Sequence, residues 1–191
     1  KHLDLPIEYD TLQAAGSMMG SGGMIVMDED DCMVAMAQFY LGFTVEESCG
    51  KCSPCRIGNK RLFEILNKIT SGKGTEEDLR KLRDLGQVIK DTSLCGLGQT
   101  SPNPVLSTLD NFYDEYVAHV TEQRCPAHQC RDLTVYYINP KKCTGCTLCA
   151  HVCPVHAIVG ERKATHIIDP NICIRCGSCL EKCRFGAIYV Y

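Results

Sequence analysis

The chain of 191 residues contains no tryptophan, and its longest uninterrupted apolar runs last only a few residues. A membrane-spanning helix needs about 18 or more consecutive apolar residues, so none is expected. The sequence opens on Lys1 without a charged and then apolar leader, and we therefore expect no signal peptide. A net charge of −3 lacks the basic excess that nucleic-acid binding requires.

The usual signatures of bond-making catalysis are also missing. No Gly-Lys-Ser/Thr sequence follows the glycine-rich stretch 16–23, so a phosphate-binding P-loop is not expected, and tight turns are the simpler interpretation. No serine–histidine–aspartate group and no pair of carboxylates stands out, which argues against hydrolytic or acid–base catalysis. Four histidines have no evident partner. They are interpreted as surface residues or as residues that contact a metal ligand without binding the metal themselves: His2, His151, His156 and His166.

Cysteine, in contrast, is abundant. The chain has 15 cysteines, an odd number, and they are clustered at short repeated spacings. A disulfide-stabilised secreted domain is usually shorter and carries a leader. Clustered thiols without a leader favour metal ligation over disulfides, and they predict a reducing, cytoplasmic location.

The composition predicts an α+β chain with four parts. Residues 1–31 are interpreted as the tail of a domain whose beginning is missing, with one short strand at Met24–Met27. Residues 32–120 are expected to form a four-helix bundle, residues 121–136 a connector, and residues 137–191 a separate small domain.

The four helices are predicted from apolar residues at helical spacing and from end signals. The first carries the apolar face that begins at Met33. The second begins near Pro54 and ends at Ser71-Gly72-Lys73-Gly74. Thr75 is expected to cap the third, which has three acidic residues in its first turn. Asn103-Pro104 opens the fourth, whose predicted buried face is Leu106, Leu109, Phe112, Tyr113 and Tyr116.

The C-terminal part repeats itself, since the pattern of residues 138–143 recurs at 168–173 and Ala157-Ile158 recurs as Ala187-Ile188. Each half is predicted to contain a short strand, a cysteine loop, a helical turn and a second strand, related by a pseudo-twofold axis. Both halves have C-x2-C-x2-C-x3-C spacing, in which the fourth thiolate ligates the other cluster of a two-cluster ferredoxin. The two predicted ligand sets for 4Fe–4S clusters are therefore Cys143, Cys146, Cys149 and Cys183, and Cys173, Cys176, Cys179 and Cys153.

These motifs show that residues 137–191 resemble a bacterial-type ferredoxin domain with two 4Fe–4S clusters. One departure is Arg184, which stands where proline usually follows the fourth cysteine, whereas Pro154 keeps it in the first half. Zinc alone would explain pairs of C-x2-C but not eight thiols in this doubled pattern.

A third set of thiols lies in the predicted bundle. Three cysteines at two-residue intervals precede a helix, and one remote cysteine closes the site. The alternatives are a zinc site and incidental buried cysteines. The predicted ligands of this further 4Fe–4S cluster are Cys49, Cys52, Cys55 and Cys95.

The stretches Glu46–Gly58 and Met19–Asp28 resemble the cluster loop and the end of the β-grasp domain in the flavin- and NADH-binding subunit of respiratory complex I and its soluble relatives. In that family this cluster receives electrons from FMN, which NADH reduces. The resemblance implies that FMN and NAD(P) bind to an upstream part missing from this fragment, so no residue here is assigned to either cofactor.

A complex I-like tail followed by a two-cluster ferredoxin domain resembles the beta subunit of multimeric NAD(P)-linked FeFe hydrogenases, including electron-bifurcating ones. The resemblance implies as partners an FeFe hydrogenase catalytic subunit, a thioredoxin-like 2Fe–2S subunit and soluble ferredoxin. The alternatives are the equivalent subunit of a formate dehydrogenase, which shares these motifs, and a zinc-binding interaction module without a redox role.

Three cysteines remain outside the cluster motifs. Cys32 begins an apolar helical face and is interpreted as a buried structural thiol. The crowding of His119, Cys125 and Cys130 suits a small structural zinc site, with His128 as a candidate fourth ligand. The alternative is two unliganded surface thiols at positions 125 and 130.

The charge distribution agrees with an electron-transfer role. Residues 1–140 hold 13 basic and 20 acidic side chains, whereas residues 141–191 hold 7 basic and 3 acidic ones. Each oxidised 4Fe–4S cluster with four thiolates adds a charge of about −2. The basic excess therefore lies where two anionic clusters are predicted, and the chain is expected to relay electrons without a catalytic residue of its own.

Overall fold

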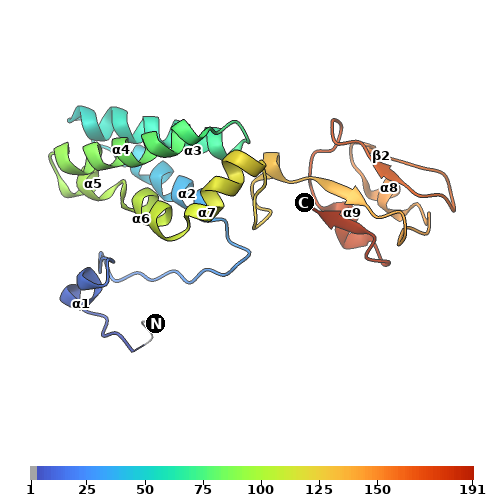
Figure 1. The fold of residues 1–191 in the computed structure, drawn as a ribbon, viewed down its shortest axis with the longest axis horizontal. Coiled ribbons are helices and arrows are strands. Elements are labelled where there is room, and N and C mark those ends of the chain that lie inside the picture. The colour runs from blue at the N-terminus through green and yellow to red at the C-terminus, as the bar shows by residue number, and fades with distance from the viewer. Residues whose placement is uncertain (1–3) are drawn as a thin grey trace.

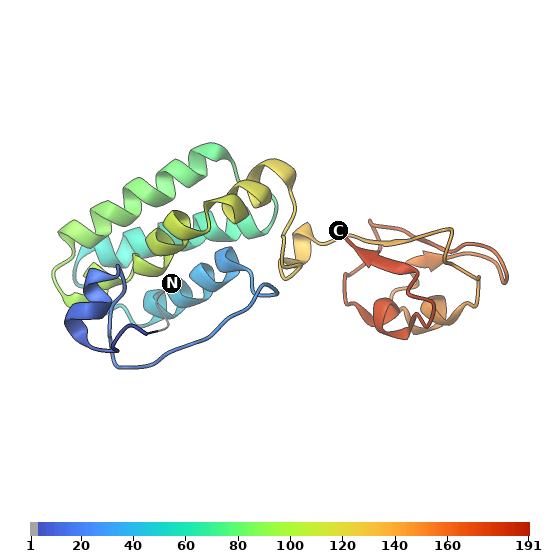
Figure 2. The same cartoon turned by 60° about the horizontal axis from the view of Figure 1, so that its bottom comes forward.

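The computed structural model describes residues 4–191, so His2 lies outside the described residues. A helical region and a small C-terminal domain lie at opposite ends of the described chain, joined by a connector (Figures 1 and 2). The elements of the helical region and connector are α1 (Tyr9–Ala14), α2 (Met33–Glu46), η1 (Pro54–Gly58), α3 (Asn59–Thr70), α4 (Glu76–Thr92), α5 (Gly96–Thr100), α6 (Asn103–Asn111), α7 (Tyr113–Val117), η2 (Ala118–Glu122) and η3 (Arg131–Leu133). None of the described helices is long and apolar enough to cross a membrane.

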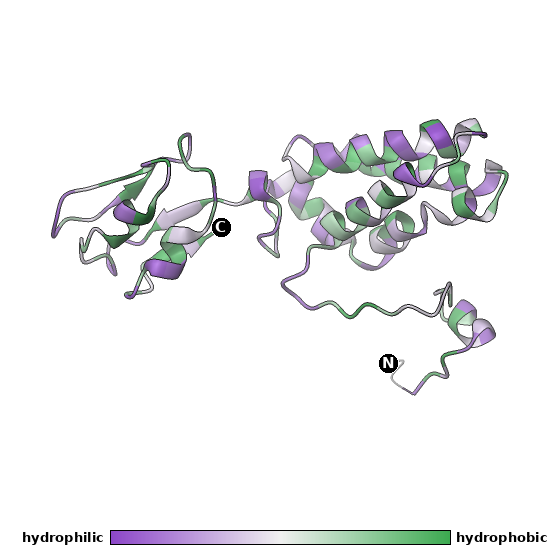
Figure 3. Ribbon diagram, turned by 180° about the vertical axis from the view of Figure 1, so that it is seen from behind, coloured by the Kyte–Doolittle hydropathy of each residue, from purple (hydrophilic) through white to green (hydrophobic). Residues whose placement is uncertain are grey.

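The N-terminal segment differs from the prediction. Residues 4–31 contain α1 and no strand, so the strand expected at Met24–Met27 is wrong for this structure. Met24, Ile25 and Val26 are 77%, 62% and 83% exposed, and this part of the chain runs as an extended segment outside the helices (Figure 3). A strand needs a hydrogen-bonded neighbour, and no other part of residues 4–31 supplies one.

Helices α2, α3, α4 and α6 pack around one apolar core, which forms the centre of the helical region. The buried side chains include Leu62, Leu66 and Ile69 of α3 and Leu82 and Ile89 of α4, which recur at helical spacing. Helix α3 ends with Ser71 as its C-cap, where the sequence predicted an end. The second helix begins at Pro54 as predicted, although its first turn, η1, is π-helical.

The predicted fourth helix is broken. Phe112 leaves the helical conformation (φ −131°, ψ 37°) and separates α6 from α7. Phe112 and Tyr113 are 45% and 48% exposed, so the single buried face expected from Leu106 to Tyr116 is wrong at these two positions. The break re-aims the chain so that Tyr116 is buried and its hydroxyl meets Thr108 Oγ1 at 2.7 Å. A periodic pattern cannot show a break that tertiary packing imposes.

Helix α4 begins with the predicted cap, which yields a stability prediction. Thr75 and Asp78 form a reciprocal capping box, and Lys68 Nζ lies 2.6 Å from Asp78 Oδ2. Replacing Thr75 by alanine removes this cap, so the free energy of unfolding should fall by about 1 kcal/mol. Urea unfolding followed by circular dichroism measures this change. The matched control is Thr92→Ala at the exposed C-terminal end of α4, where the hydroxyl only bonds Val88 O within the helix; an equal loss there would contradict the capping argument.

The C-terminal domain has the predicted order of elements in each half. They are β1 (Tyr136–Ile138), α8 (Leu148–Val152), β2 (Ile158–Val159), β3 (Ile167–Ile168), α9 (Ser178–Lys182) and β4 (Ile188–Val190). Strand β1 pairs antiparallel with β4, and β2 pairs antiparallel with β3. Each pair therefore joins strands from different halves, as a pseudo-twofold arrangement requires, and α8 and α9 occupy equivalent positions in the two halves.

The ends of this domain connect it to the rest of the chain. Val135 and Tyr191 exchange two backbone hydrogen bonds of 2.8 and 2.9 Å, which extend the β1–β4 pairing into the connector. Arg175 Nη1 lies 3.4 Å from Asp132 Oδ1 of η3. The C-terminal domain thus contacts the connector through its last residue and through one cysteine loop.

Candidate iron–sulfur centres and metal site

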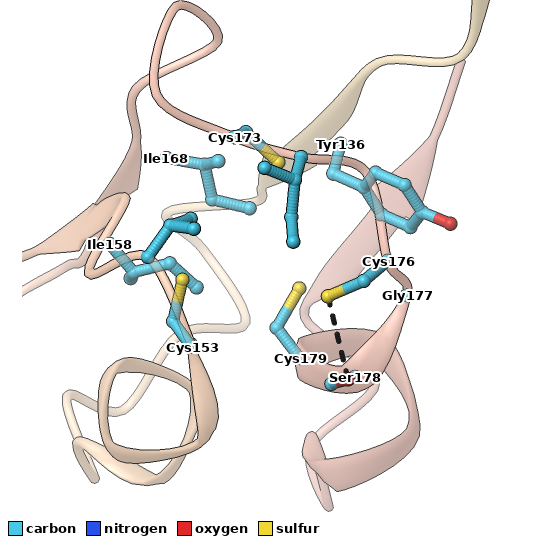
Figure 4. Close-up of a pocket in the computed structure, with 11 residues that line it drawn as sticks. Tyr136, Cys153, Ile158, Ile168, Cys173, Cys176, Gly177, Ser178 and Cys179 are labelled. Atoms are coloured by element: carbon cyan, nitrogen blue, oxygen red, sulfur yellow. Dashed lines mark hydrogen bonds between the residues drawn. The ribbon is translucent and has the colours of Figure 1, made fainter. Parts of the chain in front are cut away.

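Two pockets in the C-terminal domain each gather four cysteines. The Tyr136 pocket lies between β1, the loop before α9 and the end of α8, and Figure 4 shows its thiols pointing toward one another. The His166 pocket is its counterpart around the loop before α8. The cysteines of the Tyr136 pocket are Cys153, Cys173, Cys176 and Cys179. Those of the His166 pocket are Cys143, Cys146, Cys149 and Cys183.

The fourth cysteine of each half crosses to the other pocket. Cys153 follows α8 and Cys183 follows α9, and each lines the pocket whose other three cysteines come from the opposite half. Each sulfur accepts a backbone hydrogen bond from the residue at the same position of its half. The Cys153 sulfur accepts from Ala157 N at 3.2 Å, and the Cys183 sulfur accepts from Ala187 N at 3.3 Å. The two pockets therefore bring together the same two sets of four that the spacing predicted.

The thiols of the Tyr136 pocket differ in acidity. Hydrogen bonding with the side chain of Ser178, followed by that with its backbone, lowers the pKa of Cys176, whose sulfur lies 3.5 Å from Ser178 Oγ (Figure 4). Burial, followed by the negative charge of Cys173, raises the pKa of Cys179 to about 11. A thiolate is the metal-ligating form, so binding of a cation at this pocket must release the proton of the buried Cys179.

The third group of cysteines lies where two loops of the helical region meet. Cys49 and Cys52 precede η1, Cys55 lies within it, and Cys95 precedes α5. Hydrogen bonding to the backbone of Leu94, followed by that of Cys55, lowers the pKa of Cys52. Leu94 directly precedes Cys95, so the Cys52 sulfur lies beside the loop that carries Cys95. We call these four residues the helical site.

Polar side chains on both sides hold Cys55 in place. Its sulfur lies 3.3 Å from Ser48 Oγ and 3.5 Å from the amide nitrogen of Asn59, which is fully buried. The Asn59 carbonyl oxygen accepts a hydrogen bond of 2.8 Å from Ser101 Oγ. A side chain at Gly98 would meet Ser93 Oγ at 2.6 Å and Cys55 Cβ at 3.1 Å, so glycine is needed where the two loops touch.

The residues around two of these groups fit an iron–sulfur cluster. Among the described residues, two buried side-chain polar atoms have no hydrogen-bond partner, Ser93 Oγ and His166 Nε2. Ser93 lies beside Gly98 and Cys55, and His166 lines the pocket of the same name. Buried polar atoms are rarely left unpaired, and a thiolate or sulfide of a bound cluster is an acceptor of the kind these atoms lack.

A separate buried group of three cysteines and one histidine lies where α2, η2 and the connector meet. Its ligand atoms all lie within 4.8 Å of one another, and its members are Cys32, His119, Cys125 and Cys130. His119 Nε2 lies 3.3 Å from both Cys32 Sγ and Cys130 Sγ. We call this set the Cys3His group; its composition is that of structural zinc sites.

One member of this group is not predictable from local spacing. The sequence indicates only a structural thiol at Cys32, yet Cys32 is the fourth ligand-type side chain, whereas the candidate His128 is exposed on a turn. Cys32 precedes His119 by 87 residues, so no short motif could reveal this pairing. Helix packing, including that of α2 against α7, brings the two together.

The thiols of the Cys3His group stabilise a positive charge on His119, and a metal ion would have to displace the protons of His119 and Cys130 to bind there. The Nδ1 atom of His119 lies 2.7 Å from Glu115 O, which directs Nε2 toward the thiols. Burial opposes a charged imidazole, but hydrogen bonds to Cys125 and Cys32 outweigh it and raise the pKa of His119 to about 10. Hydrogen bonds from Cys130 and Cys32 lower the pKa of Cys125, while hydrogen bonds with Cys125 and Cys32 raise that of Cys130.

Comparison with known families matches two parts of the chain. Residues 35–119 match the NADH-ubiquinone oxidoreductase-F iron-sulfur binding region. Residues 142–188 match the 4Fe-4S dicluster domain. The first range includes the helical site, and the second includes the eight cysteines of the two pockets in the C-terminal domain.

The curated relatives agree with these matches. The chain is 60% identical over 188 residues to the NADP-reducing hydrogenase subunit HndC of Solidesulfovibrio fructosivorans, covering 98% of this chain and 38% of that protein. It is 41% identical over 126 residues to the F subunit of NADH-quinone oxidoreductase from Mycobacterium bovis, covering 66% of this chain and 28% of the relative. The chain thus spans less than two fifths of the length of these relatives.

A solved structure, that of an NAD+-reducing [NiFe]-hydrogenase in the H2-reduced state, is 31% identical with a TM-score of 0.48. The match covers 50% of this chain and 16% of the hydrogenase chain.

Proposed function

We propose that this chain relays electrons through three 4Fe–4S clusters. The chain belongs to the family of iron–sulfur subunits that are related to the F subunit of NADH-quinone oxidoreductase and to the NADP-reducing hydrogenase subunit. The observation that carries the proposal is the pair of pockets in which eight cysteines are gathered in the crossed pattern of a two-cluster ferredoxin.

Each cluster would be held by one group of four cysteines. The ligands are the four thiols of the helical site, the four of the Tyr136 pocket and the four of the His166 pocket. Bound clusters supply one-electron redox chemistry, and the protein contributes ligation, burial and hydrogen bonds that tune it. The backbone N–H groups of Ala157 and Ala187 stabilise the thiolates of Cys153 and Cys183.

The contacts of the connector suggest the order of transfer within the C-terminal domain. The Tyr136 pocket lies at the start of β1, directly after the connector, and the residue Arg175 of its cysteine loop contacts Asp132. The His166 pocket is lined by Ile138 and Phe185, which lie farther from the connector along β1 and along the C-terminal half than the residues that contact the connector. Electrons that cross the connector would therefore meet the Tyr136 pocket first.

The partners of the relay are inferred from the relatives. The name of the hydrogenase relative implies an NADP-linked complex, so one end of the relay would face a flavin and NAD(P) site outside this chain. The other end would face an FeFe hydrogenase subunit, a thioredoxin-like 2Fe–2S subunit or a soluble ferredoxin, with electron bifurcation as one mode of operation in the cytoplasm.

The Cys3His group would bind one structural zinc ion. Three thiolates and one imidazole complete a tetrahedral set without an open position, which is typical of structural and not catalytic zinc. Because the group joins α2, η2 and the connector, zinc would fix the base from which the C-terminal domain extends.

Metal analysis of anaerobically purified protein tests the proposal. Three clusters predict about 12 irons per chain, and the Cys3His group predicts about one zinc. Reduction with dithionite should produce electron paramagnetic resonance signals of reduced 4Fe–4S clusters. Protein that contains zinc, far fewer irons and no such signals would be an interaction module, and the relay would be refuted.

A further inference from the structure

The His166 pocket contains one buried polar atom without a partner. His166 is only 1% exposed and lines the same pocket as Cys143, Cys146, Cys149 and Cys183. Its Nε2 has no hydrogen-bond partner among the described residues. An unpaired polar atom in the interior is destabilising, so a partner in the pocket is expected.

The internal repeat gives this position a direct comparison. Tyr136 and His166 are equivalent, because each stands at the same distance before the first cysteine of its half, Cys143 or Cys173. Each lines the pocket that takes three cysteines from the opposite half. The Tyr136 side chain lies along the edge of its pocket (Figure 4). The two pockets thus have equivalent cysteines but differ in this neighbouring side chain, a phenol in one and an imidazole in the other.

The imidazole is held in place by its surroundings. A side chain at Gly160 would approach His166 Cγ to 2.7 Å, so the backbone of Gly160 packs directly against the ring. The Nδ1 atom lies 3.2 Å from Ala164 O, at the long limit of a hydrogen bond. A carbonyl oxygen can only accept, so a neutral ring with its hydrogen on Nε2 gives up this weak hydrogen bond. An anionic sulfur is a stronger acceptor than the carbonyl, so the ring hydrogen is expected on Nε2 when a cluster is bound.

We propose that His166 Nε2–H donates a hydrogen bond to a sulfur atom of the cluster held by Cys143, Cys146, Cys149 and Cys183. This inference depends on the proposed function, because it requires a cluster in the His166 pocket. A hydrogen bond to a sulfur stabilises the more negative, reduced cluster. His166 therefore holds this cluster at a higher reduction potential than the cluster would otherwise have.

The test is a redox titration of the full chain, monitored by electron paramagnetic resonance, with His166→Phe and His166→Gln. Phenylalanine fills the space without a donor, whereas glutamine restores an N–H. In His166→Phe the ratio of reduced to oxidised cluster at a fixed potential should fall about tenfold, which equals about 59 mV for one electron. In His166→Gln much of this loss should be recovered. Cys146→Ala removes a ligand of the His166-pocket cluster, so the electron paramagnetic resonance signal that disappears in this variant is the signal of that cluster.

The matched control is Tyr136→Phe, which changes the equivalent position of the other pocket and should leave the potential of the His166-pocket cluster unaltered. An unaltered potential in His166→Phe, with the iron content retained, would overturn the inference and leave the relay intact. Wild-type protein without iron in this pocket would instead refute the proposed function itself.

Discussion

Combining Cys183→Ala with Cys146→Ala is expected to remove no more iron than the more damaging of the two single changes. Both side chains line the His166 pocket, although they belong to different halves of the repeat. Once one ligand is lost and the cluster with it, removing a second ligand of the same cluster has nothing left to affect. Each single change should lower the iron content by about four per chain, the content of one cluster.

The contrasting double variant is Cys183→Ala with Cys176→Ala. These two cysteines lie in the same half of the sequence but line different pockets. Their effects should add, so that about eight irons are lost and only the cluster of the helical site remains. Iron analysis together with quantified spin resonance signals distinguishes the two patterns. The opposite pattern would be additive iron loss in Cys183→Ala with Cys146→Ala and non-additive iron loss in Cys183→Ala with Cys176→Ala. It would mean that each half ligates its own cluster.

Short-range signals in the sequence predicted a large part of this structure. The constant offset between the two halves predicted the order of strands and helical turns, because the same residue types recur at equivalent positions. The cap at Thr75 was predicted because its residues lie within one turn of one another. Such features depend on neighbours along the chain, which the sequence shows directly.

The errors of prediction concern features that depend on distant packing. The break at Phe112 allows Tyr116 to be buried, which no local pattern indicates. The run Met24–Met27 has the composition of a strand, but a strand also requires a partner. Cys32 and His128 illustrate the same point for a site: the nearby histidine is exposed, and the distant cysteine joins the group.

Replacing Cys32 by alanine is expected to abolish zinc binding while the iron content stays unchanged. Its sulfur is one of four ligand atoms, and it lies 3.7 Å from Cys130 Sγ and 3.3 Å from His119 Nε2. Three remaining ligands leave an open position, which weakens a structural zinc site. Iron should be retained, because none of the predicted cluster ligands belongs to the Cys3His group.

The loss of zinc should loosen the connector more than the helical region. Cys125 and Cys130 are the connector's ligands, whereas α3 and α4 supply no ligand and are also held by buried apolar side chains such as Leu62 and Leu82. Structural zinc contributes about 10 kcal/mol or more to small sites, so amide hydrogen exchange across residues 125–134 should accelerate by orders of magnitude in Cys32→Ala. His128→Ala is the matched control, since its exposed side chain lies outside the group and its zinc content should remain at about one. If His128→Ala lost the metal and Cys32→Ala kept it, the ligand set would be the one expected from local spacing, and the packing of α2 would have no part in holding the connector.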